Sequence, residues 1–363
     1  MSAVPSSPTL STTRPHLEVL DGLRGLAAVA VVVFHFMEII IPDSSKNFIG
    51  HGYLAVDFFF CLSGFVIAYA YDNRIAGMGF GRFIALRLIR LHPLILIGTV
   101  IGLVEFLFDP LVDLHAVYGS GNAVLLVLSS ALLIPYPLVK ERYANIYHLN
   151  PPTWSLLWEY VASIFYALLL FRLRNKVLWA LTVVAAVVLF YAAYHFKNLA
   201  AGWSGETFWG GGARVFFSFL AGMLVYRSQW ILPSRLGLGG VSILLLLALL
   251  SPFSDQYNWL TEPLIAIFYF PFLIALGAGT QVSDRLAAVC TFSGEISYPL
   301  YIIHYPFIWL FYSYFQIQKP GTNQLSVLVP LATGALLLMA YLTLIWLDIP
   351  IRRRLKHWLD KAR

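Results

Sequence analysis

The chain has 363 residues, of which 59% are hydrophobic and 12% charged, and its formal net charge is +6. Soluble domains carry about a quarter charged residues, so a soluble fold of this length could not cover so much apolar surface. Lipid must therefore solvate most of the chain. The positive charge does not indicate nucleic acid, because an excess of Lys and Arg marks the cytoplasmic loops of membrane proteins.

A tail rich in Ser, Thr and Pro opens the chain, and residues 1–20 are expected to be disordered and cytoplasmic. Ten apolar runs that favour membrane helices follow. They are Leu23–Ile41, Tyr53–Tyr71, Phe83–Leu107, Thr153–Phe171, Val177–Phe196, Gly212–Tyr226, Leu236–Leu250, Leu260–Gly277, Ile296–Phe315 and Leu325–Leu347. The first run is too long for a signal peptide and has no small-residue cleavage site. The sequence predicts an all-α polytopic transmembrane bundle over residues 21–350 and a basic cytoplasmic tail over 351–363.

An eleventh apolar run, Ala123–Leu138, is short and carries Pro135 and Pro137. If it does not cross the bilayer, every Arg-rich and Lys-rich loop lies in the cytoplasm, together with both termini. We therefore expect ten spans, with this run re-entrant or lying along the outer side. Irregular backbone at membrane depth is tolerated only where protein or a water-filled cavity covers it, so the run should pack over a cavity.

His35 and Glu38 lie in the first span, three residues apart and therefore on nearly one helix face. A histidine can pass a proton in either direction near neutral pH, which suits attack of a hydroxyl on a thioester. The alternative is a histidine satisfied by a neighbouring carbonyl, with Glu38 at the outer interface. Asp57, at the start of the second span, could orient an imidazole or an arginine. Ser63 and Gly64 indicate close helix packing.

Arg82, Arg87 and Arg90 open the third span, and the last two share a face at the cytoplasmic boundary. Guanidinium groups pair well with phosphates, but on spacing alone snorkelling toward lipid headgroups is the favoured explanation. Trp154 fits an aromatic belt at the membrane interface. Glu159 lies five residues into an apolar helix, where it could position a hydroxyl or pair with an arginine.

Three further polar positions fall within or beside later spans. Arg214 enters a span after a glycine run that is no phosphate loop, because the run lacks a Lys-Ser/Thr ending. His304 lies in mid-span and is another functional candidate. Asp348 and Pro350 are expected to end the last span. The nine histidines are scattered without ligand spacing, so no metal site is predicted, and two cysteines imply no disulfide framework.

Together these segments resemble the membrane-bound acyltransferase family 3, which includes bacterial O-antigen, exopolysaccharide and Nod-factor O-acetyltransferases. The resemblance runs in order through nearly the whole chain: LDGLRGLAAVAVVVFHF, GYLAVDFFFCLSGFVI, RLIRLHP, WSLLWEYVASIFY, SYPLYIIHYP and DIPIRRR. Each pattern is weak alone, but six in this order are specific.

The resemblance implies that His35 is catalytic and that Arg87 and Arg90 hold the phosphates of CoA, with Arg82 and Trp154 assigned to the same donor site. Glu159 corresponds to the family's acidic residue after WSL.

His304 matches the histidine of the family's late LYxxH pattern, and Asp57 is placed with the catalytic group. Tyr160 stands where the family commonly has a second acidic residue, which argues against a mechanism that needs two carboxylates. Some family members carry a fused extracytoplasmic domain. None is expected here, so transfer would finish in the membrane domain or with a separate extracytoplasmic or glycan-assembly partner.

The resulting hypothesis is a multi-pass enzyme of the bacterial inner membrane. It would move an acyl group, with acetyl favoured, from cytosolic acyl-CoA to a hydroxyl of a saccharide or glycolipid, as in exopolysaccharide or lipopolysaccharide. His35 would act as general base or as transient acyl carrier. The alternatives are a proton-coupled lipid or glycan transporter and a membrane scaffold without enzymatic activity.

Overall fold

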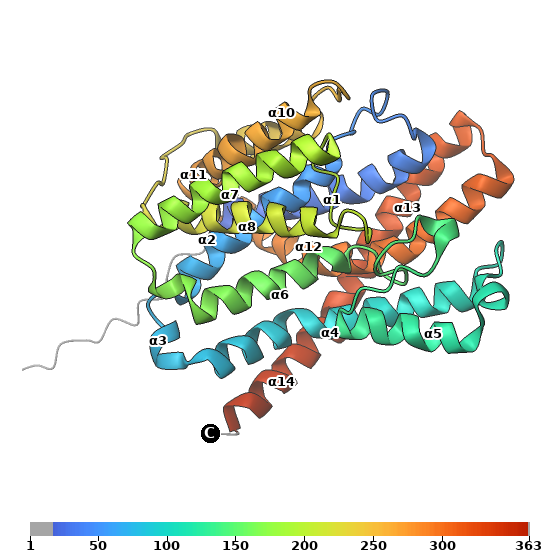
Figure 1. Cartoon of the computed structure of the whole chain (residues 1–363), viewed down its shortest axis with the longest axis horizontal. Coiled ribbons are helices and arrows are strands. Elements are labelled where there is room, and N and C mark those ends of the chain that lie inside the picture. The colour runs from blue at the N-terminus through green and yellow to red at the C-terminus, as the bar shows by residue number, and fades with distance from the viewer. Residues whose placement is uncertain (1–16, 362–363) are drawn as a thin grey trace, which may run out of the picture.

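The computed structural model describes residues 17–361, and that part of the chain is built of helices without a named strand. Figure 1 shows most of the helices running side by side in one bundle. They are α1 (Glu18–Ile40), α2 (Ala55–Tyr71), α3 (Ile75–Met78), α4 (Phe80–Phe108), α5 (Leu114–Leu132), α6 (Thr153–Leu168), α7 (Asn175–Phe196), α8 (Phe208–Arg227), α9 (Gly237–Leu249), α10 (Asn258–Leu264), α11 (Phe270–Ala278), α12 (Asp284–Gln318), α13 (Thr322–Thr343) and α14 (Ile349–Lys361). The predicted all-α polytopic bundle is confirmed.

Nine helices of the described part are long and apolar enough to cross a bilayer. Two predicted spans are shorter than expected: α6 has 16 residues and α9 has 13. The predicted span Leu260–Gly277 consists of α10, a π-helical turn and α11, which together form one continuous helix, Asn258–Ala278. The predicted disordered tail lies mostly outside the described residues, but α1 already begins at Glu18, inside its range.

The centre of the bundle consists of α1, α2, α8 and α12, whereas α13 lies at the rim. The helices α2 and α8 approach so closely that a side chain at Gly64 would collide with the backbone carbonyl of Phe219. Gly222 meets the backbone of Cys61 in the same way. Small residues at the contact allow this approach, so the interpretation of Gly64 as a packing position is confirmed. Ser63 instead donates a hydrogen bond to Glu159.

The segment predicted as Ala123–Leu138 has different boundaries, because α5 runs from Leu114 to Leu132 and the residues after Leu133 are irregular. After α5 the chain folds back to the C-terminal end of α4. There Arg142 contacts Glu105 and Asp109. Tyr143 and Asn145, which follow the predicted run, line a cavity that Ala123–Leu138 itself does not line. Since α5 is also long enough to cross, ten spans with both termini cytoplasmic remain a prediction.

The helix of the last predicted span continues past Asp348 and Pro350, and the position at which the span itself ends stays a prediction. A π-helical turn, Leu344–Asp348, joins α13 to α14, so the expected tail continues as helix to Lys361. Asp348 is buried and pairs with Arg352, with 2.6 Å between Oδ2 and Nη2. Pro350 comes just after the π-helical turn, where the regular backbone ladder is already interrupted.

Arg142 provides a test of what holds the returning segment in place. Its guanidinium lies 2.8 Å from Glu105 and 2.9 Å from Asp109, and all three are buried. Substituting Arg142→Met strands two buried carboxylates, which costs about 3–5 kcal/mol. We expect a lower midpoint of thermal unfolding in detergent.

Lys46→Met is the matched control. The Lys46 ammonium hydrogen-bonds Asp43 and lowers the pKa of that carboxyl to about 2, but both groups are exposed. Exposed pairs contribute little, so the midpoint should be that of the parent. Equal midpoints for all three proteins would show that the Arg142 pairs do not stabilise the fold.

Candidate active site

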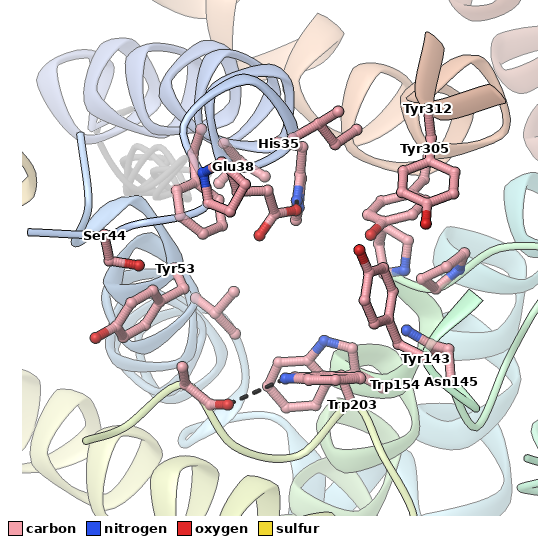
Figure 2. A pocket seen from close by; sticks show the side chains of 18 of the residues that line it. His35, Glu38, Ser44, Tyr53, Tyr143, Asn145, Trp154, Trp203, Tyr305 and Tyr312 are labelled. Carbon is pink, nitrogen blue, oxygen red and sulfur yellow. Dashed lines mark hydrogen bonds and ion pairs between the residues drawn. The ribbon is translucent and has the colours of Figure 1, made fainter. Parts of the chain in front are cut away.

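A cavity of about 430 Å³ lies beside His35, and we call it the His35 cavity. Figure 2 shows the side chains around its open centre, with His35 and Glu38 on one wall, Tyr305 and Tyr143 on the adjoining wall, and Trp154 and Trp203 across from His35. The lining is dominated by aromatic rings: Phe34, Tyr53, Tyr143, Trp154, Trp203, Phe253, Tyr301, Tyr305, Trp309 and Tyr312. Small-molecule sites have volumes of about 300–1,000 Å³, so the cavity can hold an organic substrate.

His35 is oriented by Glu38, one turn further along α1. The Nδ1 atom of His35 lies 2.6 Å from Oε1 of Glu38. An ionised carboxylate only accepts hydrogen bonds, so neutral His35 carries its hydrogen on Nδ1 and leaves the lone pair on Nε2. An imidazole with one nitrogen held by a carboxylate and the other unprotonated is suited to general-base chemistry. Glu38 lies near the end of α1 and its side chain is 37% exposed, so its interfacial placement stays a prediction beside this contact.

His304 packs against His35 but does not line the cavity. The two rings stack with centroids 5.3 Å apart, and Tyr305 meets the His35 ring edge-on at 4.7 Å. Nδ1 of His304 lies 3.1 Å from the Leu300 carbonyl, while its Nε2 is buried and has no partner within the described residues. In this geometry His304 supports the His35 ring. The His304 side chain does not reach the cavity, so its catalytic role stays a prediction.

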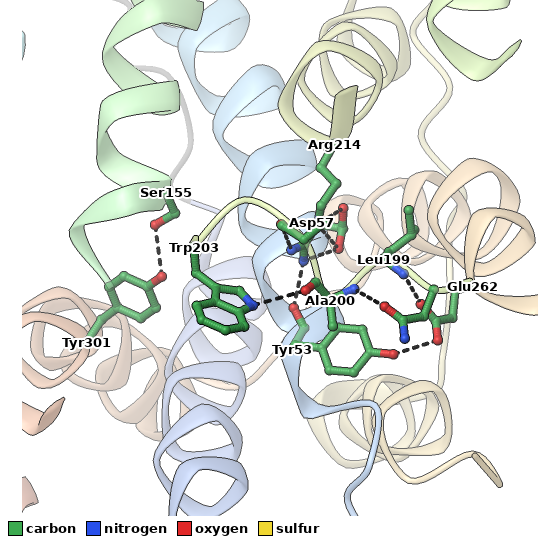
Figure 3. A network of polar contacts seen from close by, with 11 residues as sticks. Tyr53, Asp57, Ser155, Leu199, Ala200, Trp203, Arg214, Glu262 and Tyr301 are labelled. Atoms are coloured by element: carbon green, nitrogen blue, oxygen red, sulfur yellow. Dashed lines mark hydrogen bonds and ion pairs between the residues drawn. The ribbon is translucent and has the colours of Figure 1, made fainter. Parts of the chain in front are cut away.

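Asp57 forms a buried ion pair with Arg214 and does not contact His35. Figure 3 shows the Arg214 guanidinium beside Asp57. The guanidinium also donates to the backbone carbonyls of Tyr53 and Ala201. Nη2 of Arg214 lies 2.7 Å from Oδ2 of Asp57, and the guanidinium sits over the Trp154 ring at 5.2 Å. Of the two roles predicted for Asp57, orienting an arginine is the observed one. The pair fixes the wall of the cavity from behind.

A second cavity, of about 230 Å³, is lined by Arg24, Arg87 and Arg90, and we call it the arginine cavity. Much of its remaining wall is apolar, including Phe59, Leu62, Val66, Leu91 and Leu156. Arg24 is tied to the carbonyl of Gly294 by Nη2 at 2.6 Å. Three guanidinium groups beside an apolar channel suit a ligand with phosphates at one end and a flexible chain at the other.

Arg90 is the least compensated of these arginines. Within residues 17–361 no hydrogen bond or ion pair to a carboxylate holds it, and its charged neighbours include Arg24 and Arg352 as well as Asp348. A buried cation without a partner is costly unless it faces water or an anion. This arrangement favours an anionic ligand in the arginine cavity.

Glu159 lies in the arginine cavity, not in the His35 cavity. Its carboxylate pairs with Arg87 and accepts a hydrogen bond from Ser63. Arg87 also donates to Ser163 at 3.2 Å. The predicted alternative in which Glu159 pairs with an arginine is therefore observed, and the carboxylate positions a guanidinium.

Two residues assigned to the donor site lie elsewhere. Arg82 pairs with Asp360 of α14 at 2.6 Å and does not line the arginine cavity. Trp154 lines the His35 cavity. Arg82 lies away from the arginine cavity because its position on α4 directs its side chain toward α14. The sequence analysis did not predict α14 to be a helix.

The sequence analysis missed Arg24 and the orienting contact made by Glu38. Arg24 and His35 are 11 residues apart, which is about three helical turns and about 16 Å along α1. This spacing places both on one helix face, so periodicity could have joined them. No sequence signal indicates the contact between Ser155 and Tyr301, which come from α6 and α12.

The two cysteines, Cys61 and Cys290, are buried and free. In the described range 17–361 no three His, Cys, Asp or Glu side chains lie close enough to hold a metal ion.

Comparison with known proteins gives matches over most of the chain. A family profile described as an acyltransferase domain matches residues 17–347. "Protein 2 in picA locus" of Rhizobium radiobacter is 32% identical over 187 residues, covering 49% of this chain and 95% of that protein.

The "O-acetyltransferase OatA" of Staphylococcus aureus (strain NCTC 8325 / PS 47) is 24% identical over 369 residues, which is 93% of this chain and 58% of that protein. The chain thus spans less than two thirds of the length of this relative. No solved structure matches.

Proposed function

This chain belongs to the acyltransferase family whose profile it matches over residues 17–347, and it is a multi-pass membrane protein. From that premise we propose that it is an O-acetyltransferase of the bacterial inner membrane. It moves an acetyl group from cytosolic acetyl-CoA to a hydroxyl of a saccharide or glycolipid at the cell surface. The name of the Staphylococcus aureus relative supports the reaction type.

One observation carries the proposal: a cavity lined by guanidinium groups and a cavity lined by an oriented imidazole lie next to each other in one bundle. Val56 and Tyr301 line both. The arginines of this cavity come from the first halves of α1 and α4, and Arg74 and Arg82 flank the start of α4. Excess positive charge marks the cytoplasmic side, so the donor enters there and the acceptor reaches the His35 cavity from the other side.

Acetyl-CoA fits the arginine cavity by chemistry. Its phosphates match Arg24, Arg87 and Arg90, since guanidinium forks bind phosphate oxygens with paired hydrogen bonds. Its pantetheine arm suits the apolar wall and points the thioester toward Tyr301. A free phosphate or a sugar phosphate would use the arginines but would leave that wall uncovered.

In the reaction we propose, Nε2 of His35 takes the proton from the acceptor hydroxyl as its oxygen attacks the thioester carbonyl carbon. The new C–O ester bond forms, the C–S bond breaks, and the proton passes from His35 to the departing thiolate to give CoA. Glu38 stabilises the imidazolium between these steps. A transient acyl group on His35 uses the same orientation.

The acceptor is a saccharide because the His35 cavity combines aromatic faces with amides and hydroxyls. Trp203 and Tyr143 offer flat apolar surfaces for sugar C–H groups, and Asn145 and Asn198 offer hydrogen bonds for sugar hydroxyls. The transporter alternative accounts for buried polar groups but requires no acyl donor.

Substituting His35→Ala tests the chemistry. In inside-out membrane vesicles given acetyl-CoA labelled in its acetyl group, the parent should transfer label to saccharide. The variant should be slower by about 10²–10⁴-fold, the usual contribution of a general base. His195→Ala, an exposed histidine on α7 outside both cavities, should behave as the parent. Label transfer by His35→Ala at the parent rate would refute the assignment, and no transfer by the parent would favour transport.

Substituting Arg90→Gln tests the donor site. Removing an uncompensated guanidinium should weaken acetyl-CoA binding by about 10–100-fold, the scale of one charge-assisted hydrogen bond to phosphate. Isothermal titration of the purified protein measures this. Arg353→Gln, on the exposed side of α14, is the control. Unchanged affinity in Arg90→Gln would place the phosphates elsewhere.

Substituting Glu38 by Gln or by Ala distinguishes the orienting hydrogen bond to His35 from the negative charge of the carboxylate. Glu38→Gln keeps an acceptor for Nδ1–H, whereas Glu38→Ala removes it. We expect kcat to fall in the order parent, Gln, Ala, with the KM for acetyl-CoA nearly unchanged, because the donor phosphates bind in the other cavity. Steady-state kinetics in vesicles measure both constants. Equal kcat values in all three proteins would mean that Glu38 does not position His35.

A further inference from the structure

The His35 cavity and the arginine cavity are separated by one thin wall. Of the side chains that line the two cavities, only Val56 on α2 and Tyr301 on α12 line both. Tyr301 is 8% exposed. Any group that moves from the arginine cavity to His35 must therefore pass Val56 and the Tyr301 ring.

Tyr301 is held in the wall on two sides. Its hydroxyl lies 2.8 Å from Oγ of Ser155, as Figure 3 shows, and the Phe59 ring meets its face edge-on at 5.8 Å. Ser155 Oγ lies 2.9 Å from the Pro152 carbonyl and donates its one hydrogen there. Tyr301 is therefore the donor to Ser155, and its hydroxyl also lies 3.5 Å from the Pro152 carbonyl.

The helix around Tyr301 is weakened on both sides. Pro299 and Pro306 lie inside α12 and remove the backbone hydrogen bonds to the carbonyls of Glu295 and Ile302. The Tyr301 ring is thus carried on a short stretch of helix between two missing bonds, whereas Ser155 and Val56 sit in the first turns of their helices. Displacing the ring breaks the hydroxyl's contacts with Ser155 and the Pro152 carbonyl and leaves the regular helices intact.

We propose that Tyr301 and Val56 are the residues that set the acyl chain length this protein transfers. The inference rests on the proposed function, because it concerns the donor of the same reaction. An acetyl thioester is small enough to pass when Tyr301 releases Ser155. A longer acyl chain extends beyond the carbonyl and collides with the ring and with Val56. The wall thus selects two-carbon donors and refuses chains of four or more carbons.

The test compares acetyl-, butyryl- and hexanoyl-CoA as donors in inside-out vesicles, each labelled in the acyl group. The parent should transfer acetyl and discriminate strongly against hexanoyl. Tyr301→Ala removes the ring and should raise the ratio of hexanoyl to acetyl transfer at least about tenfold, since a pocket discriminates by about tenfold or more per methylene group. Tyr301→Phe keeps the ring and should retain the parent's preference. Tyr314→Ala, on the same helix outside both cavities, is the control.

Val56→Ala widens the wall from the other helix and should shift the ratio in the same direction, which keeps the test decisive if Tyr301→Ala does not fold. Titration of acetyl-CoA reports on the fold of each variant, because the arginines lie outside the wall. An unchanged chain-length profile in a folded Tyr301→Ala or in Val56→Ala would overturn the inference. So would a parent that transfers hexanoyl as well as acetyl. A parent that transfers no acyl group would instead refute the proposed function.

Discussion

An ionised side chain inside an apolar bundle must have a partner or face a water-filled space, and this constraint organises the whole molecule. Arg142 and Arg214 are buried, and each is paired with carboxylates and backbone or hydroxyl groups. These arginines hold structure in place. His35 and Arg90 differ, because one presents a free ring nitrogen to a cavity and the other has no carboxylate partner among the residues described. The difference separates groups that stabilise the fold from groups available to a ligand.

The buried pairs also explain how a cavity persists in a bundle that could otherwise collapse. Arg214 is anchored by Asp57 and stacks on Trp154, so one wall of the His35 cavity is rigid. The segment after α5 forms another wall and is tied to α4 through Arg142. Charge pairs at the edges of the cavity therefore hold its aromatic lining apart. This gives the oriented imidazole room for a substrate.

In the reaction that we propose, donor and acceptor bind in separate cavities, which suits their different chemistry. The nucleotide end of acetyl-CoA is polyanionic, whereas the acceptor that we propose is a saccharide on the opposite side of the bilayer. Arginines along α1 and α4 suit the first ligand, and aromatic rings with amides suit the second. Only the small acyl group has to move between them, past Tyr301.

The sequence alone determined the class of the protein and the identity of its main chemical groups. Long apolar runs require membrane helices, and ionisable residues inside them are costly enough to mark His35, Arg87 and Arg90 as candidates. Tertiary structure decided which groups meet. Helical spacing could join His35 to Glu38, since both lie on α1, but the pairs of Asp57 with Arg214 and of Ser155 with Tyr301 each join helices that are far apart in the chain. Such contacts depend on how helices rotate and cross when they pack, and no local pattern records that choice.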